Sequence, residues 1–227
     1  MTTLHYIYDP LCGWCYGAAP LVKAAREVLD VRPHGGGMMS GAHRQAVTPQ
    51  LRAYVKQHDE RIAQLTGQHF GRDYVDGLLN QTGVVLDSEP PTAAMLAAET
   101  IAGRGLDILA QLQIAHYVEG RPVADRTTLI EVATALGLDS SAFAEALDRL
   151  SGETVQTHIK ETRKLMADVG AQGFPSSVLE TEAVLQIVDF AGYLGHPQAF
   201  QDWLRRQSKP APTRTGALAC DINGCAS

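Results

Sequence analysis

Four cysteines carry most of the reactive chemistry in this sequence, and they form two pairs near opposite ends of the chain. The first pair, Cys12 and Cys15, has the spacing CxxC and follows a short apolar run at residues 4–8. The residues after Cys12 carry apolar side chains at helical spacing, so the pair is predicted at the junction of a strand and a helix. A dithiol at such a junction is typical of thiol–disulfide exchange.

We expect Cys12 to be the attacking nucleophile and Cys15 to be the resolving thiol. Cys12 is predicted at the first turn of the helix, where unpaired backbone N–H groups and the helix dipole favour a negative sulfur. Such surroundings lower a cysteine pKa from about 8.5 to about 3.5–7.5. Gly13 and Trp14, between the cysteines, add no cation. We therefore expect a less oxidising couple than one with a basic dipeptide at these positions.

A proline near the other end of the chain is the second element of the predicted site. Phe174 and Pro175 immediately precede a predicted strand, and a strand edge is a place where a cis proline is kept. If Pro175 is cis and faces the dithiol, the backbone of Phe174 can pair with an extended substrate as a short β-bridge. Trp14, Phe174 and Pro175 are therefore the predicted substrate-binding residues. The alternatives are a simple strand-edge proline and plain packing of Trp14.

The elements that must position these residues lie at the two ends of the chain. They are a strand at 4–8, a helix from 12 to about 29, a strand at about 31–39, strands at 177–179 and 183–188, and a helix from 189 to about 206. Between the two ends, apolar side chains recur at helical spacing. The pattern is β-α-β, then helices, then β-β-α, which predicts an α/β domain interrupted by an all-helical one. Insertion at a surface loop is tolerated because the core contacts of the host survive.

Three parts of the chain are predicted from this pattern. Residues 1–42 and 168–207 would form the α/β domain, residues 43–167 the inserted helical domain, and residues 208–227 a flexible tail. The tail carries the second pair, Cys220 and Cys225. This pair is interpreted in three ways: a partner that exchanges electrons with Cys12 and Cys15, an independent disulfide, or an idle tail. A tethered dithiol has an effective concentration near millimolar, which makes exchange within one chain feasible.

The composition excludes several classes of protein. The formal net charge of −6 argues against a nucleic-acid binder, which needs clustered Lys and Arg. No window approaches the roughly 18 apolar residues of a membrane span. No signal peptide precedes the first predicted strand, so we expect a cytoplasmic protein. In a reducing compartment, paired cysteines are more often catalytic, redox-sensing or metal-binding than structural.

These residues also carry a resemblance to a known family. The chain resembles the DsbA-family thioredoxin-fold oxidoreductases, and in particular their cytosolic FrnE-like branch. The resemblance covers nearly the whole chain and rests on residues 9–15 (DPLCGWC), 118–121, 137–139, 173–175 (GFP) and the pair Cys220 and Cys225. It implies a thioredoxin fold with a helical insertion, dithiol oxidoreductase or disulfide isomerase activity, and a cis Pro175 beside Cys12. The CxxC lacks the histidine of periplasmic members, which argues against a strongly oxidising role.

The predicted function is a thiol–disulfide oxidoreductase or disulfide isomerase that acts on protein or peptide disulfides. Glutathione or thioredoxin is the expected electron donor, and no cofactor is expected. A glutathione-dependent transferase or isomerase on the same scaffold is one alternative, although such enzymes typically carry serine at the nucleophile position. A non-catalytic redox sensor or holdase is another. No metal is expected, since the spacing of Cys220 and Cys225 is at or beyond the usual gap between zinc ligands.

Overall fold

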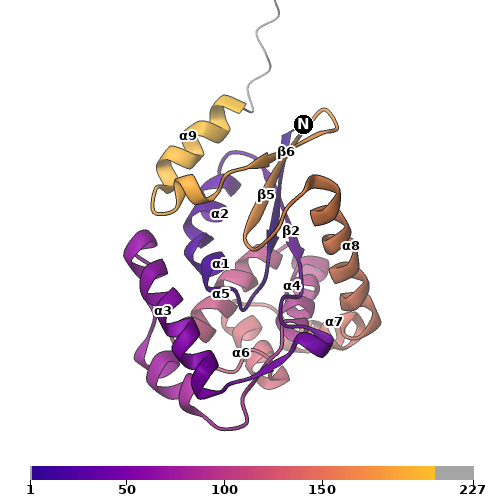
Figure 1. The fold of residues 1–227 in the computed structure, drawn as a ribbon. Coiled ribbons are helices and arrows are strands. Elements are labelled where there is room, and N and C mark those ends of the chain that lie inside the picture. The colour runs from indigo at the N-terminus through magenta and orange to yellow at the C-terminus, as the bar shows by residue number, and fades with distance from the viewer. Residues whose placement is uncertain (1, 208–227) are drawn as a thin grey trace, which may run out of the picture.

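A mixed sheet lies between two layers of helices (Figure 1). The structure, a computed structural model, describes residues 2–207. Within them, four strands have the order β2-β1-β5-β6; they are β1 (Thr2–Tyr8), β2 (Asp30–Gly35), β5 (Ser176–Thr181) and β6 (Val184–Val188). β1 pairs with β2 in parallel and with β5 antiparallel, and β5 pairs antiparallel with β6. This arrangement confirms the predicted β-α-β and β-β-α halves of one α/β sheet.

Helices connect and cover these strands. In chain order they are α1 (Gly13–Gly17), α2 (Ala19–Arg26), α3 (Pro49–Thr66), α4 (Glu89–Ala102), α5 (Gly105–Tyr117), α6 (Arg126–Ala135), α7 (Ser140–Leu150), α8 (Glu153–Val169) and α9 (Pro197–Gln207). Short helical turns lie at Gly41–His43, Asp73–Gly77, Leu78–Asn80 and Ala191–Tyr193. None of the helices within residues 2–207 has the length and apolar character needed to cross a membrane.

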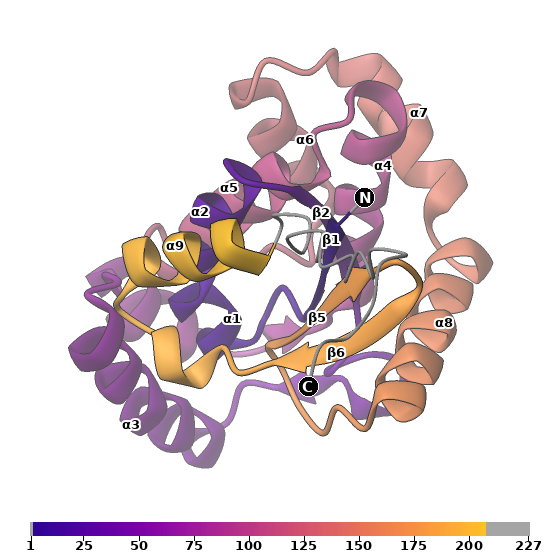
Figure 2. The same cartoon turned by 90° about the horizontal axis from the view of Figure 1, so that it is seen from above.

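Both faces of β1 are buried, and alternate side chains enter different cores. Leu4, Tyr6 and Tyr8 belong to the large core that also holds side chains of α2 and α9. Ile7 points to the other face, where it packs with Met166 of α8 and with a side chain of β5. This alternation follows from the two-residue period of a strand. Figure 2 shows the result, with α2 and α9 on one side of the sheet and α8 on the other.

The first predicted helix is divided into two. α1 ends at Gly17 and α2 begins at Ala19, with Ala18 as the residue between them. Pro20 lies in the first turn of α2, where the missing N–H of proline leaves no helical hydrogen bond unmade. The dithiol is therefore carried by a short separate helix that precedes α2.

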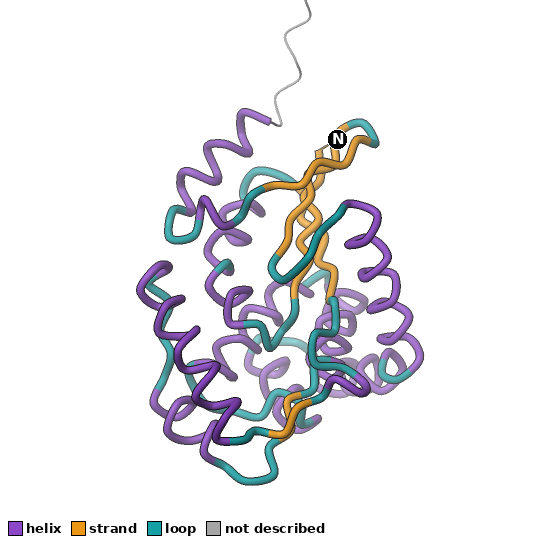
Figure 3. The backbone as a smooth tube through the Cα atoms, viewed as in Figure 1, coloured by secondary structure: helices purple, strands orange, loops and turns teal. Residues whose placement is uncertain are grey.

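The segment between β2 and β5 is mostly helical, with one addition that the sequence did not predict. β3 (Gln45–Ala46) and β4 (Val85–Leu86) form a short antiparallel ladder at the end of the molecule furthest from α9 (Figure 3). α8 runs through the predicted boundary at 167/168 and packs on β2 and β6. The domain boundaries at residues 42, 167 and 207 stay predictions.

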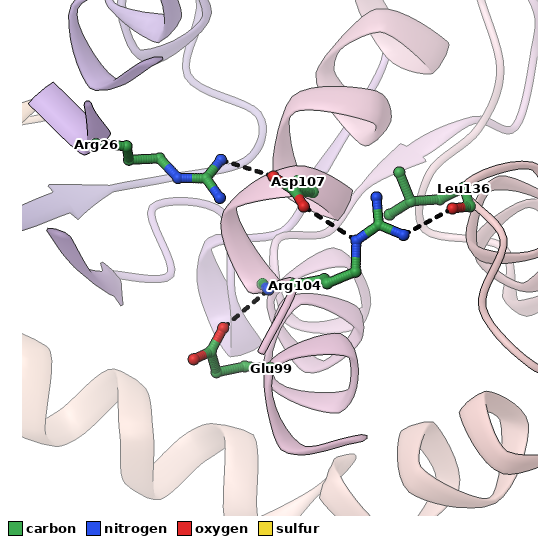
Figure 4. Close-up of polar contacts among 6 residues, drawn as sticks. Arg26, Glu99, Arg104, Asp107 and Leu136 are labelled. Atoms are coloured by element: carbon green, nitrogen blue, oxygen red, sulfur yellow. Dashed lines mark hydrogen bonds and ion pairs between the residues drawn. The ribbon is translucent and has the colours of Figure 1, made fainter. Parts of the chain in front are cut away.

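A chain of charged contacts joins α2 to the helical segment. Asp107 of α5 accepts hydrogen bonds from Arg26 of α2 at 2.6 Å and from Arg104 at 3.0 Å. Arg104 also donates to the carbonyl oxygen of Leu136 at 2.9 Å, and Glu99 accepts from the backbone N–H at the start of α5 (Figure 4). A cavity of about 370 Å³ lies beside these contacts, between α2 and α5. The two parts of the chain are thus connected by ion pairs rather than by packing alone.

Candidate active site

The antiparallel pairing of β1 and β5 brings the two predicted halves of the site together. Ile7 pairs with Ser176, so the loop that follows β1 lies beside the loop that precedes β5. The thiol of Cys12 donates to the carbonyl oxygen of Phe174 at a sulfur–oxygen distance of 3.5 Å. The Phe174–Pro175 peptide bond is cis, as the resemblance implied. Residues 162 positions apart in the sequence therefore meet at one point.

Cys12 and Cys15 carry free thiols at the start of α1. Cys12 is the N-cap residue, with an extended backbone, and its carbonyl oxygen accepts from the N–H groups of Cys15 and Tyr16 at 2.9 and 3.1 Å. Cys12 is 6% exposed, whereas Cys15 is fully buried. Of the two cysteines, only Cys12 thus retains any exposed area.

The surroundings of Cys15 keep its thiol protonated. Burial raises the pKa of Cys15 well above its usual value, and the hydrogen bond with Cys12 and the nearby Cys12 charge raise it further. The N–H of Asp9 donates to the Cys15 sulfur at 3.4 Å, which opposes part of this rise. Tyr6 donates its hydroxyl to the Cys15 carbonyl oxygen at 3.3 Å and so holds the backbone of α1 against β1.

Asp9 fixes the loop between β1 and the dithiol. Its carboxylate is fully buried and accepts from three groups: the N–H of Leu11 at 2.9 Å, the N–H of Met38 at 2.5 Å and the hydroxyl of Ser88 at 2.9 Å. Burial raises the pKa of Asp9, and these hydrogen bonds and the charge of Arg163 oppose that rise. The carboxylate therefore ties the dithiol loop to the loop after β2 and to the start of α4.

The predicted substrate-binding residues lie around Cys12 and are partly exposed. The guanidinium of Arg61, from α3, lies 5.8 Å from the ring centroid of Trp14. That of Arg163, from α8, lies 5.0 Å from the ring centroid of Phe174. The backbone at Gly36 lies against the Phe174 ring as well, and a side chain at this position would overlap ring atoms Cε1 and Cζ. Both aromatic rings are thus held in place by residues that the sequence analysis did not single out.

A second buried carboxyl group contacts the dithiol motif itself. Asp59 of α3 is 6% exposed, and its Oδ1 atom would lie 2.8 Å from a Cβ placed at Gly13. Its Oδ2 atom accepts from the hydroxyl of Tyr74 at 3.0 Å. Burial raises the pKa of Asp59 to about 7, and the hydrogen bond from Tyr74 opposes part of this shift. Asp59 is therefore a carboxyl group that changes charge near neutral pH beside the CxxC.

Sequence reasoning missed Asp59, Arg61 and Arg163 because they lie on helices whose apolar spacing predicts only packing. No local motif marks them, and each reaches the site through the way its helix docks. Cys220 and Cys225 lie outside the described residues, so the interpretations of the second pair stay predictions. Within residues 2–207, no group of three or more His, Cys, Asp or Glu side chains is placed to hold a metal ion.

Comparisons with known proteins agree with this geometry. A solved structure of the cytosolic disulfide reductase DsbM from Pseudomonas aeruginosa is 56% identical, covers 90% of this chain and 98% of its own, and has a TM-score of 0.86. A structure of that protein with GSH gives 54% identity, the same coverage and a TM-score of 0.84. A putative protein disulfide isomerase from Nitrosomonas europaea, at 24% identity, 92% and 99% coverage and a TM-score of 0.73, shares the fold.

The comparison with curated protein sequences gives no match. A family model described as a DSBA-like thioredoxin domain matches residues 3–193, which include the whole sheet, the dithiol and Pro175. The match and the solved structures confirm the predicted thioredoxin-type fold and the resemblance from which it was drawn. This chain belongs to the family of DSBA-like thioredoxin domains.

Proposed function

We propose that this chain is a thiol–disulfide oxidoreductase that reduces protein or peptide disulfides through Cys12 and Cys15. The observation that carries the proposal is the pair of unequal thiols, with Cys12 slightly exposed and in contact with the Phe174 carbonyl oxygen and Cys15 fully buried. Oxidoreductase function is confirmed by the family match and the similarity to a disulfide reductase. Reduction, as the net direction, is supported by that same relative and by a CxxC without a histidine.

The reaction follows from the positions of the two sulfurs. The Cys12 thiolate attacks one sulfur of the substrate disulfide, forms a mixed disulfide and releases the first substrate thiolate. Cys15 then loses its proton and attacks the Cys12 sulfur, which releases the second substrate thiolate. The substrate gains two electrons and two protons in total, and the chain is left with a Cys12–Cys15 disulfide. A thiol reductant must supply two electrons to restore the dithiol.

The substrate and the reductant are both thiol compounds in this proposal. In this proposal an extended substrate chain pairs with the backbone at Phe174, next to Cys12, and contacts Trp14 and Pro175; all three residues are partly exposed. Glutathione is the reductant that the relative solved with GSH favours, and thioredoxin is the alternative. Because both operate in a reducing compartment, and because that relative is described as cytosolic, we place this chain in the cytoplasm.

The test is a turnover assay on insulin with glutathione or dithiothreitol as the reductant. Wild-type protein should reduce insulin catalytically, and Cys12→Ser should abolish this activity because no attacking sulfur remains. Cys15→Ser should accumulate a mixed disulfide on Cys12, visible by mass spectrometry, since the resolving thiol is missing. One equivalent of oxidation without turnover would instead identify a redox sensor, and conjugation of glutathione without disulfide turnover would identify a transferase.

A further inference from the structure

Two arginines from different helices border the dithiol. Arg61 of α3 stacks on Trp14, and Arg163 of α8 stacks on Phe174, whose carbonyl oxygen accepts from Cys12. α3 and α8 lie on opposite sides of α1 and β5 in both views of the fold (Figures 1 and 2). A guanidinium therefore lies on each side of Cys12. Each guanidinium is held against an aromatic ring, either that of Trp14 or that of Phe174, which lies near Cys12.

Neither guanidinium forms an ion pair with a carboxylate within the described residues, although Arg163 lies close enough to the buried Asp9 to lower the pKa of that carboxyl group. Eight other arginines form ion pairs with Asp or Glu within residues 2–207, whereas Arg61 and Arg163 form none there. Glu60 precedes Arg61 in the chain but makes no ion pair with it in this part of the structure. Both arginines are exposed. On a chain of net charge −6, the surroundings of the dithiol thus carry two exposed guanidinium groups that form no ion pair within residues 2–207, besides the buried carboxyl groups of Asp9 and Asp59.

The two arginines differ in how firmly they are held. Arg163 donates from Nε to the carbonyl oxygen of Gly36 at 2.6 Å and from Nη2 to that of Gly37 at 3.2 Å, so its plane is fixed and Nη1 stays available. Arg61 makes no hydrogen bond within residues 2–207, and its contact with Trp14 leaves all its N–H groups to solvent or ligand. A planar guanidinium with free N–H groups is suited to carboxylates, which it can bind through two parallel hydrogen bonds.

We infer that Arg61 and Arg163 form a carboxylate-binding pair that selects disulfides with acidic groups on both sides of the sulfur. The inference rests on the proposed function, since it concerns the substrate of the same dithiol. It names the substrate class as acidic peptide disulfides. The arginines act by binding and orienting the substrate, while the sulfur chemistry stays with Cys12 and Cys15.

The test uses three peptide disulfides that differ only in the residues flanking the cysteine, which are two Glu, two Gln or two Lys. Wild-type protein at low salt should give the highest kcat/KM with the Glu peptide, mostly through a lower KM. This preference should shrink as ionic strength rises toward 1 M, where the screening length falls to about 3 Å. Arg61→Gln should reduce the ratio of Glu-peptide to Gln-peptide kcat/KM by about two- to fivefold.

Charge reversal gives the sharper test. Arg61→Glu should move the preference toward the Lys peptide, whereas Arg61→Lys should retain part of the preference for the Glu peptide. Arg163→Lys tests the guanidinium beside Phe174, because it removes the guanidinium and keeps a positive charge near Gly36. The control is Arg149→Gln, which removes an exposed arginine of α7 that forms no ion pair within residues 2–207, and it should leave the ratio unchanged.

The outcomes separate the inference from the proposed function. Equal turnover of the three peptides by wild-type protein would overturn the carboxylate-binding pair and leave the oxidoreductase intact. An Arg61→Glu variant that still prefers the Glu peptide would overturn it too. Absence of turnover with every peptide would overturn the proposed function, and the inference with it.

Discussion

Cys12 and Cys15 belong to one short helix, yet their sulfur atoms have different surroundings. Cys12 is slightly exposed and its thiol donates to the Phe174 carbonyl oxygen, while burial and the Cys12 charge hold the pKa of Cys15 high. A buried, protonated Cys15 cannot compete for the substrate in the first step. It becomes a nucleophile only when Cys12 has lost its negative charge in a mixed disulfide, because that charge is one cause of the raised pKa.

Asp59 gives a prediction at the same scale. Its pKa is raised to about 7 in the folded state, against about 3.9 in an unfolded chain. Between these values the folded state holds the extra proton, so the free energy of unfolding falls as pH rises from about 4 to about 7. Asp59→Asn removes the titrating group and with it this fall in the free energy of unfolding. The variant should therefore gain stability relative to wild type as pH rises through that window, as measured by urea unfolding at several pH values.

The control for this prediction is Glu60→Gln, which changes an exposed carboxyl group on the same helix. The difference in the free energy of unfolding between Glu60→Gln and wild type should stay constant between pH 4 and 7. A flat difference for Asp59→Asn over the same range would show that Asp59 does not titrate near neutral pH in the folded protein.

At the scale of elements, the site depends on loops that approach one another closely. β2 ends at Gly35, and the next residue, Gly36, donates its N–H to the carbonyl oxygen of Tyr8 at 2.8 Å. The ring of Phe174 then lies directly against the Gly36 backbone. Only a residue without a side chain leaves room for both contacts, which explains the glycine at position 36.

Gly36→Ala tests this close approach. The added Cβ would overlap ring carbons Cε1 and Cζ of Phe174, so the ring and the loop before β5 must move. We expect a loss of stability of about 1–3 kcal/mol, as for other overpacked sites, together with slower reduction of insulin. Urea unfolding and the turnover assay measure the two effects.

Gly173→Ala is the matched control, because a Cβ at Gly173 meets no atom within 4 Å in the described structure. Gly173 lies in the loop that carries Phe174, and the substitution introduces the same methyl group. Equal effects of the two substitutions would show that the contact between Gly36 and Phe174 is not what limits the site.

At the scale of the whole molecule, the helical segment completes the site that the sheet begins. α3 supplies Asp59 and Arg61, α4 begins beside the Ser88 hydroxyl that binds Asp9, and α8 supplies Arg163. Elements outside the sheet thus surround a dithiol that the sheet and α1 carry. The position of these helices relative to the sheet is therefore part of the active site.

Substitution of Asp107, which joins α2 to α5, tests how the helical segment is held against the sheet domain. Burial acts to raise the pKa of Asp107, but hydrogen bonds from Arg26 and Arg104 outweigh it and lower the pKa. A carboxylate with a lowered folded pKa stabilises the fold above the unfolded pKa of about 3.9, and this contribution is lost as pH falls through the folded value. Asp107→Asn should cost about 0.5–1 kcal/mol at pH 7 and much less at pH 3, by urea unfolding.

Hydrogen exchange at α2 and at the start of α5 supplies the second measurement, since both should open more readily in Asp107→Asn. The control is Asp148→Asn, which removes an ion pair with Arg126 that involves only the helical segment. It should leave exchange at α2 unchanged. If Asp148→Asn raises exchange at α2 as much as Asp107→Asn does, the contact in Figure 4 is not specific to this junction.

Much of the fold could be predicted from the sequence because its signals are local. Alternating or continuous apolar runs marked β1, β5 and β6. Glu182 and Ala183, both at positive φ, form the tight turn between the last two strands, although Ala183 was predicted to begin the second of them. The second strand is shorter than predicted, since it ends at Gly35, and the last helix begins only at Pro197. Glycines and a proline shorten both elements, and periodicity alone does not fix where an element stops.

The sequence by itself determined the dithiol, its place between a strand and a helix, and the proline that meets it, because motif and periodicity are written in neighbouring residues. Only the tertiary structure decided which distant side chains surround that dithiol. Asp59 contacts Gly13, and Arg61 lies over the ring of Trp14, because α3 packs beside α1. The ring of Phe174 contacts the backbone of Gly36 because the loops before β5 and after β2 lie side by side. How these helices and loops pack against one another depends on many weak contacts spread over the whole molecule. Such packing cannot be predicted from any short stretch of sequence.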